Sequence, residues 1–180
     1  MDIITHLTKE HREAEGLMAS LSESEPGPAR NALIRELETA LAVHMAVEEQ
    51  FLYPIVVERI GAEDADEVNN EHDLARDSVA TLWQMADEPG FGAAVDSLKG
   101  GIGHHVEEEE QDLFPKLREV AATDLAKMDP ERLEAAVEAT RAELYEKARA
   151  AGVEGRSTMT KDELANAVAP PCSRRRRSWR

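Results

Sequence analysis

The sequence predicts an all-α fold: an up-down-up-down four-helix bundle followed by a small C-terminal helical appendage. In four segments, apolar residues or histidines recur alternately three and four positions apart, which is the period of one face of an α-helix. Short stretches that contain glycine or proline separate these segments. Aromatic residues make up only 4% of the 180 residues, which favours an aliphatic helical core.

The first two helices are expected on either side of residues 24–28, which contain two prolines and a glycine. The first spans residues 2–22, and its core face comprises Ile4, Leu7, His11, Ala14, Met18 and Leu21. The second ends at Gly61, and its core face comprises Ile34, Leu37, Leu41, His44, Glu48, Phe51 and Ile55.

The third and fourth helices are expected on either side of Pro89 and Gly90. The third has a core face of Val68, His72, Ala75, Val79, Leu82 and Ala86. The fourth has a core face of Val95, Leu98, Ile102, His105 and Glu109. Gly100, Gly101 and Gly103 weaken this helix by up to about 1 kcal/mol each relative to alanine. We expect these small residues to allow a neighbouring helix to approach closely.

Polar residues of the two halves recur at a constant offset of 61 residues. The recurring pairs are Glu10 and Glu71, His11 and His72, His44 and His105, Glu48 and Glu109, and Glu49 and Glu110. A duplicated bundle explains repeated apolar positions, but it does not require repeated histidine and glutamate. A two-metal centre on a pseudo-symmetric scaffold does require them, because each half supplies equivalent ligands.

Six of the repeated residues lie on the predicted core faces and are the candidate metal ligands: His11, His44, Glu48, His72, His105 and Glu109. Each His-x-x-x-Glu spacing places its two side chains about one turn, or ~6 Å, apart on one helix face. Buried charges are costly unless they are paired or bound to metal. Imidazoles suit iron, zinc, copper or nickel, carboxylates can bridge two ions, and zinc and manganese remain open as alternatives to iron.

Two other metal motifs are absent from the sequence. No histidine has a glutamate three residues before it, as in the Glu-x-x-His motif of ferritin-like di-iron bundles. No His-Glu-x-x-His occurs either, so a zinc protease is disfavoured. Six protein donors do not fill two six-coordinate ions, which leaves positions for water or a small ligand.

Residues 1–125 resemble the hemerythrin-like family in its duplicated HHE cation-binding form, on the pattern H…HxxxEExxLYP…H…HxxxEExxLFP. The resemblance implies a four-helix bundle with two non-haem iron ions, bridged by oxo or hydroxo groups and by carboxylates, on the six residues above. Oxygen-carrying members have a second third-helix histidine where this chain has Arg76. They also have His-x-x-x-x-Asp where it has His105-x-x-x-Glu109. The resemblance therefore favours members that sense or react with small oxidants over reversible oxygen carriers.

Several neighbouring residues have less certain roles. His104 offers the alternative spacing His104-x-x-x-x-Glu109, but the offset of 61 selects His105. His6 lies outside the repeat and is expected at the surface. Glu49 and Glu110 are expected on a solvated acidic face, with a supporting role behind the ligands as the alternative. Tyr53 and its counterpart Phe114 are expected to pack in the core, although Tyr53 alone carries a hydroxyl that can donate a hydrogen bond or act in redox chemistry.

The charge of the chain is strongly uneven. The formal net charge is -16, although five of the last seven residues are arginines. An acidic body repels nucleic acid and anionic membranes.

No apolar run approaches the roughly 18–20 residues of a membrane span, and the N-terminus lacks a signal-peptide pattern. Cys172 is the single cysteine, so disulfides have no part in the fold. A cytoplasmic protein without membrane association is the resulting expectation.

Three regions are predicted: the bundle at residues 1–127, a helical appendage at 128–169, and a basic disordered tail at 170–180. The appendage begins with a helix after Pro130, and the capping box Thr160-x-x-Glu163 opens a second helix. About 25 of its residues resemble the helix-extended-helix module at the N-terminus of the transcription terminator Rho. The arginine-rich tail and Trp179 could contact nucleic acid.

The leading functional hypothesis is a non-haem di-iron protein that binds, senses or reacts with dioxygen, nitric oxide or hydrogen peroxide. A catalase-like or peroxide-reducing enzyme is one form of it. The alternatives are an iron-handling or storage protein and a metal-responsive, nucleic-acid-associated regulator that acts through the C-terminal segment. The oligomeric state is left open.

Overall fold

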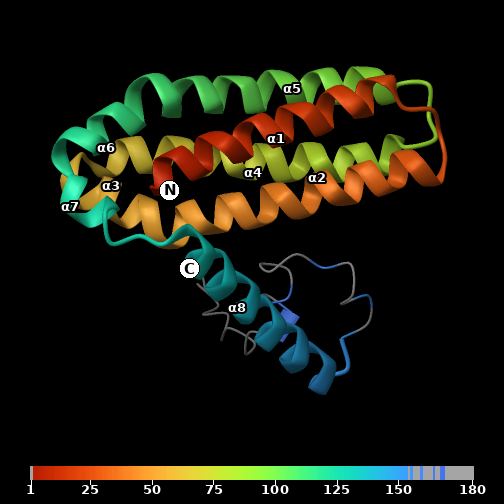
Figure 1. Ribbon diagram of the computed structural model, residues 1–180. Coiled ribbons are helices and arrows are strands. Elements are labelled where there is room, and N and C mark those ends of the chain that lie inside the picture. Colours follow the sequence, from red (N-terminus) through yellow and green to blue (C-terminus); the bar gives the residue numbers. More distant parts are fainter. Residues whose placement is uncertain (1, 154, 156–158, 160–163, 165–166, 169–180) are drawn as a thin grey trace, which may run out of the picture. The chain divides into compact units, whose positions relative to one another are not determined.

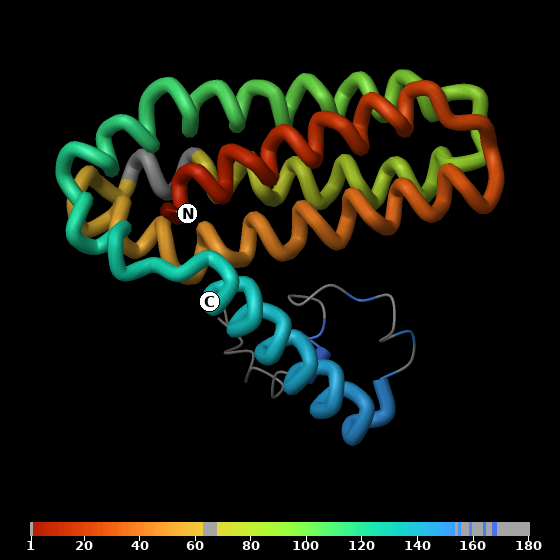
Figure 2. The backbone as a smooth tube through the Cα atoms, in the orientation of Figure 1, coloured from red at the N-terminus to blue at the C-terminus, as the bar shows by residue number. Residues whose placement is uncertain are grey.

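Four long helical segments run side by side in the first part of the molecule (Figures 1 and 2). The computed structural model describes residues 2–153, 155, 159, 164 and 167–168, with the backbone alone at 63–67. The chain divides into two compact units, Met1–Glu134 and Ala135–Arg180. The elements of the first unit are α1 (Ile3–Glu23), α2 (Pro28–Val47) continued by α3 (Tyr53–Arg59), α4 (Ala62–Met85), α5 (Phe91–Glu108) continued by α6 (Phe114–Val120), and α7 (Ala122–Leu125). These segments form the predicted four-helix bundle.

The starts of the first two helices follow from local chemistry. Asp2 caps α1, because its side chain accepts a hydrogen bond from the backbone N–H of Thr5 at 3.0 Å. Pro28 occupies the first turn of α2, where its missing N–H costs nothing. Gly27, directly before it, has a φ of 128°, a conformation that residues with a side chain rarely adopt.

The bundle core is aliphatic and follows the predicted faces closely. Every residue predicted on the core faces of the first, third and fourth helices is buried. The largest cluster of apolar core residues includes Leu21, Ile34, Leu37, Leu82, Val95 and Leu98. The amphipathic pattern therefore identified the inward faces of these helices correctly.

The second predicted face is wrong at its C-terminal end. Phe51 and Ile55 are only partly buried, whereas Leu52, Tyr53 and Val56 are buried. The cause is a π-helical turn, η1 (Glu48–Leu52), which adds one residue to a turn and so rotates the inward face. An equivalent turn, η2 (Glu109–Leu113), interrupts the other half.

The three glycines of α5 do not serve close helix packing. A Cβ atom added at Gly100, Gly101 or Gly103 would meet nothing within 4 Å, because all three residues are exposed. The expectation that they allow a neighbouring helix to approach is therefore wrong.

The continuous helix Pro28–Arg59 is long and apolar enough to cross a membrane by length and composition alone. This criterion concerns mean hydropathy and tolerates charged residues such as Glu48 and Glu49, so it does not require the uninterrupted apolar run that is missing from the sequence. Half of its most apolar window is buried, and the core helix of a water-exposed bundle meets the same criterion. Whether the protein associates with a membrane stays a matter of prediction.

The second unit contains most of α8 (Pro130–Ala150). Val137 and Ala148 of this helix are buried, as is Leu164. Arg141 donates a hydrogen bond to the backbone oxygen of Met159 at 3.2 Å. The predicted capping box Thr160–Glu163 and the basic tail at 170–180 lie outside the described residues, and the resemblance to the Rho module remains a prediction.

Candidate metal centre

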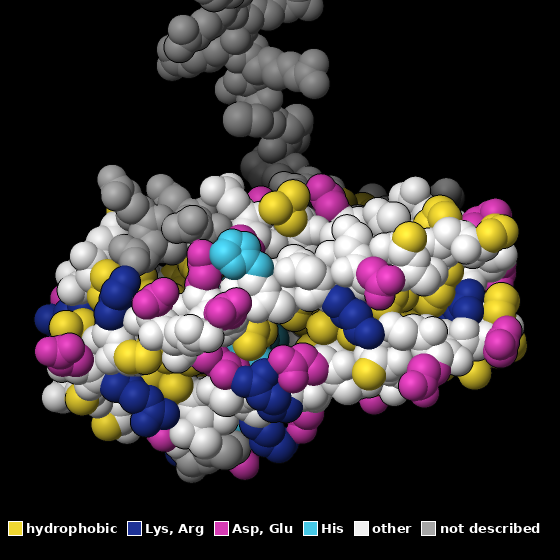
Figure 3. Space-filling view, turned by 90° about the horizontal axis from the view of Figure 1, so that it is seen from above, with side chains coloured by type: hydrophobic (Ala, Val, Ile, Leu, Met, Phe, Trp, Pro, Cys, Tyr) yellow, Lys and Arg dark blue, Asp and Glu magenta, His cyan; other side chains and the backbone are white. Residues whose placement is uncertain are grey.

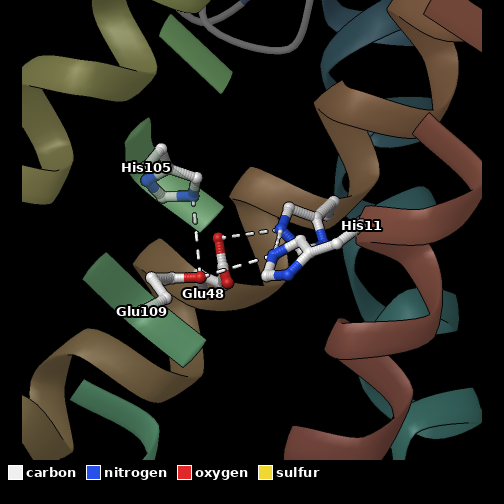
Figure 4. Close-up of side chains that lie close together, drawn as sticks. His11, Glu48, His105 and Glu109 are labelled. Atoms are coloured by element: carbon white, nitrogen blue, oxygen red, sulfur yellow. Dashed lines mark hydrogen bonds and ion pairs between the residues drawn. The ribbon is translucent and has the colours of Figure 1, made fainter. Parts of the chain in front are cut away.

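The six candidate ligands lie together inside the bundle, and four of them are labelled in Figure 4. None is more than 5% exposed, and both glutamates are fully buried. The four histidines come from four different helices: His11 from α1, His44 from α2, His72 from α4 and His105 from α5. The two glutamates begin the π-helical turns η1 and η2. The turn that rotates the inward face is thus located at the site, where such turns are often found.

The Nε2 atoms of the histidines face the two glutamates. Glu48 Oε2 lies 3.3 Å from Nε2 of both His44 and His72. Glu109 Oε2 lies 3.4 Å from His11 Nε2 and 3.6 Å from His105 Nε2. Donor atoms of five of these residues, all but His72, lie within 4.8 Å of one another. This spacing suits donors that share metal ions at bond lengths of about 2 Å.

A carboxylate binds the other ring nitrogen of each histidine. The pairs are His44 Nδ1 with Glu10 (2.9 Å), His105 Nδ1 with Glu71 (3.1 Å), His72 Nδ1 with Glu49 (2.8 Å) and His11 Nδ1 with Glu110 (2.9 Å). A carboxylate that accepts the Nδ1 proton fixes the ring tautomer and leaves the Nε2 lone pair available to a metal. All four pairs obey the 61-residue offset.

We call the four carboxylates that bind Nδ1 atoms the outer carboxylates, and arginines hold two of them in place. Arg76 donates to Glu49 at 2.6 Å, and Arg12 donates to Glu110. Arg76, which stands where oxygen carriers have a second histidine, thus binds the carboxylate that orients His72. Glu49 and Glu110 were expected on a solvated face, with a supporting role behind the ligands as the alternative. Their side chains are only 25% and 22% exposed and contact the histidines, which supports the alternative.

Tyr53 has a polar role in the site as well as a packing role. Its hydroxyl group lies 3.1 Å from His72 Nε2, 3.2 Å from Glu109 Oε1 and 3.5 Å from Glu48 Oε2. Burial, and then the two carboxylates, raise the pKa of this phenol well above its usual value. Tyr53 is therefore a protonated donor among the candidate ligands and a seventh polar residue of this cluster.

The two central glutamates differ in protonation. Burial raises the pKa of Glu48, but the imidazoles of His44, His72 and His105 outweigh burial and hold that pKa well below its usual range. Burial and the neighbouring Glu48 carboxylate raise the pKa of Glu109. Without a metal, one buried carboxylate is therefore ionised more easily than the other.

Two of the histidines bind protons more tightly than a free imidazole. Burial lowers the pKa of His72, but Glu48 and Glu49 outweigh it and raise that pKa to about 9. Burial likewise opposes Glu109, Glu48 and Glu110 at His11, and the net effect raises its pKa. Protons on these rings offset the negative charge of the site where a cation is not present.

Three buried atoms at the centre of this cluster have no hydrogen-bond partner among the described residues: Glu48 Oε1, His105 Nε2 and Glu109 Oε2. An orphaned buried polar atom is costly and calls for an explanation. All three atoms are metal donors by chemical type, and all belong to predicted ligands. The residues present therefore fit a bound metal.

The remaining histidines lie outside this cluster. His104 is 63% exposed, so of the two adjacent histidines it is His105 that faces inward. His6 was expected at the surface, but its side chain is only 15% exposed and contacts Glu134. Glu10 and Glu71 received no role from the sequence, although their recurrence beside His11 and His72 was a usable signal.

The fold and this site together define a metal-binding helical bundle. Residues 2–117 match the family described as the Hemerythrin HHE cation binding domain. This match spans more than half of the chain, so the protein belongs to the hemerythrin HHE cation-binding family.

Among solved structures, the chain is similar to a crystal structure of a hemerythrin HHE cation binding domain-containing protein from Mycobacterium kansasii, with 25% sequence identity and a TM-score of 0.69. The match covers 93% of this chain and 99% of that one, so the similarity extends past the residues that the family covers. No curated protein matches the chain.

Proposed function

We propose that the protein holds two non-haem iron ions in this centre and reacts there with small oxidants. The candidate oxidants are dioxygen, nitric oxide and hydrogen peroxide, and the reaction is either sensing or catalase-like or peroxide-reducing turnover. The observation that supports the proposal best is the set of four Nε2 atoms directed at two buried, incompletely partnered carboxylates. A pair of iron ions supplies Lewis acidity and one electron per ion.

Each half of the bundle would contribute two histidines and one glutamate to the pair of ions: His11, His44 and Glu48 from the first half, and His72, His105 and Glu109 from the second. The outer carboxylates keep the Nδ1 protons in place and so keep Nε2 free for the metal. The Tyr53 hydroxyl group can donate a hydrogen bond to Glu109. It can also donate to an oxidant that enters the site.

The test compares two adjacent histidines on one helix. Metal analysis and an ultraviolet-visible spectrum of protein purified with and without air measure metal content and oxidation state. We expect iron, and near-ultraviolet absorption that changes when peroxide is added to the ferrous protein. The His105→Ala variant should lose metal and peroxide consumption, whereas His104→Ala, which replaces an exposed ring, should keep both. Equal metal content in the two variants would reject the site. Peroxide consumption no faster than that of free iron would reject the catalytic form.

A further inference from the structure

A cavity of about 150 Å³ lies against the four histidines, between α1, α2, α4 and α5. Most of its other lining residues follow His11 and His72 along α1 and α4, or precede His44 and His105 along α2 and α5. Glu48, Glu109 and Tyr53 do not line it. The histidines therefore border both the central carboxylates of Glu48 and Glu109 and this cavity.

Most of the wall area of the cavity is apolar, and the polar lining comes from histidines, three glutamates and Ser78. The apolar lining includes Leu41, Met45, Ala75, Leu98, Ile102 and Val106. Among the lining residues, His105 has a buried Nε2 atom without a hydrogen-bond partner. A ligand that fits here has an apolar body and one polar end that faces the imidazoles.

The cavity reaches the surface at α4 and α5. Gly101 lines it, is exposed, and has open space where a side chain would be. Leu74, also in the lining, is 66% exposed, which is unusual for a large apolar residue of this chain. Figure 3 shows hydrophobic side chains between acidic ones on one face of the bundle. Gly100 does not line the cavity. A side chain added at Gly101 would therefore border the cavity, whereas one added at Gly100 would not.

Size and charge restrict the occupant further. A dry cavity of this volume binds a molecule such as benzene, which is several times larger than dioxygen, nitric oxide or hydrogen peroxide. The charged lining residues are the acidic Glu10, Glu13 and Glu71, and no lysine or arginine is among the described residues that line it. Carboxylates repel an anion, which disfavours ionised fatty acids. The mostly apolar walls disfavour a charged group of either sign, so a neutral ligand fits best.

We propose that this cavity binds a small neutral alkyl hydroperoxide, with its alkyl group against the aliphatic walls and its peroxide oxygens toward the histidines. The inference rests on the proposed function, because it gives that metal centre its substrate class. If the six candidate ligands hold two ferrous ions, reduction of the hydroperoxide would break the O–O bond. It would consume two protons and one electron from each ion, and would yield an alcohol and water.

Two probes test the proposal on the metal-loaded full chain. Binding of tert-butyl alcohol, an unreactive relative of the substrate, is measured by calorimetry. Consumption of tert-butyl hydroperoxide is compared with that of hydrogen peroxide. Gly101→Leu closes the opening and Ala75→Leu fills the interior, and Gly100→Leu is the control, because it adds the same side chain one residue away into open solvent.

We expect the alcohol to bind, and both cavity variants to lower the ratio of alkyl hydroperoxide to hydrogen peroxide consumption by about tenfold or more, the scale of steric discrimination in apolar pockets. The Gly100→Leu control should keep the ratio of the unaltered protein. Absence of alcohol binding, or binding unchanged in both folded cavity variants, would overturn the inference. Alcohol binding without reaction toward either peroxide would uphold the cavity as a binding site and reject the catalytic form of the proposed function instead.

Discussion

The two halves of the bundle, α1 to α3 and α4 to α6, share their histidines and differ in the groups around them. Each half has two histidines, one central glutamate at a π-helical turn and two outer carboxylates, at matching positions. Phe114 stacks on His11 with ring planes 4° apart, whereas its counterpart Tyr53 places a hydroxyl group among the candidate ligands. The residues that repeat are the candidate ligands and the carboxylates that orient them, and at the Tyr53 and Phe114 position the halves differ by one hydroxyl group.

The charge pairs behind the two halves are reversed. Arg12 pairs with Glu15 at 2.6 Å, and the equivalent positions hold Asp73 and Arg76, which pair at 2.9 Å. Each arginine also reaches an outer glutamate of the other half. Both halves therefore have an arginine that binds an outer glutamate, but the arginine stands at a different position of the repeat. This indicates that its charge matters more than its exact helix position.

Removal of one histidine from each half should have the largest effect. The His44→Ala/His105→Ala protein should lose most of its bound metal, because it deletes an Nε2 donor from both halves. Each single variant should keep part of it. Metal content by elemental analysis, with His104→Ala as the control, decides this. Two metals per chain in the double variant would contradict the assignment.

Replacement of an outer carboxylate should weaken metal binding by about 10–100-fold, the usual cost of losing the group that orients a ligand. Glu10→Gln and Glu71→Gln alter equivalent positions, beside His44 and His105. Competition with a chelator measures the affinity. If Glu10 and Glu71 contribute equally, the two variants will lose metal affinity to the same extent. A loss confined to one variant would show that one half dominates, and no loss in either would refute the orienting role.

Removal of the Tyr53 hydroxyl group tests the asymmetry directly. Tyr53→Phe makes the two halves alike at this position and leaves Glu109 Oε1 without a buried donor. We expect chelator-treated protein to lose about 1–3 kcal/mol of unfolding free energy, the cost of an unsatisfied buried group. Urea unfolding measures this change. Phe114→Tyr is the matched variant, and stability unchanged by Tyr53→Phe would mean that the hydroxyl group has only a packing role.

The reversed arginines should matter least. Arg76→Ala and Arg12→Ala each remove a partly exposed ion pair, so each should cost no more than about 1 kcal/mol of stability. Their effect on chelator competition should be smaller than that of Glu10→Gln. A larger effect of Arg76→Ala than of the glutamine variants would place Arg76 closer to the metal chemistry than the structure does.

The sequence by itself determined the bundle and its six candidate ligands. Amphipathic spacing reports the inward face wherever a helix keeps its regular period, and this holds for α1, α4 and α5. The offset of 61 residues selected His105 over His104, because His105 is the counterpart of His44 and adjacent residues point to different sides of a helix. Both signals are local or periodic, so they can be read without any contact between helices.

Tertiary structure decided the rest. The π-helical turn η1 changed the inward face after Glu48, so a regular helical period could not place the Tyr53 hydroxyl group in the site. The roles of Glu10 and Glu71 depend on distances between helices, which no spacing within one helix contains. The cavity beside the histidines exists because side chains from four helices leave a volume unfilled. Such a volume is a property of the packed bundle, since each helix contributes only one wall.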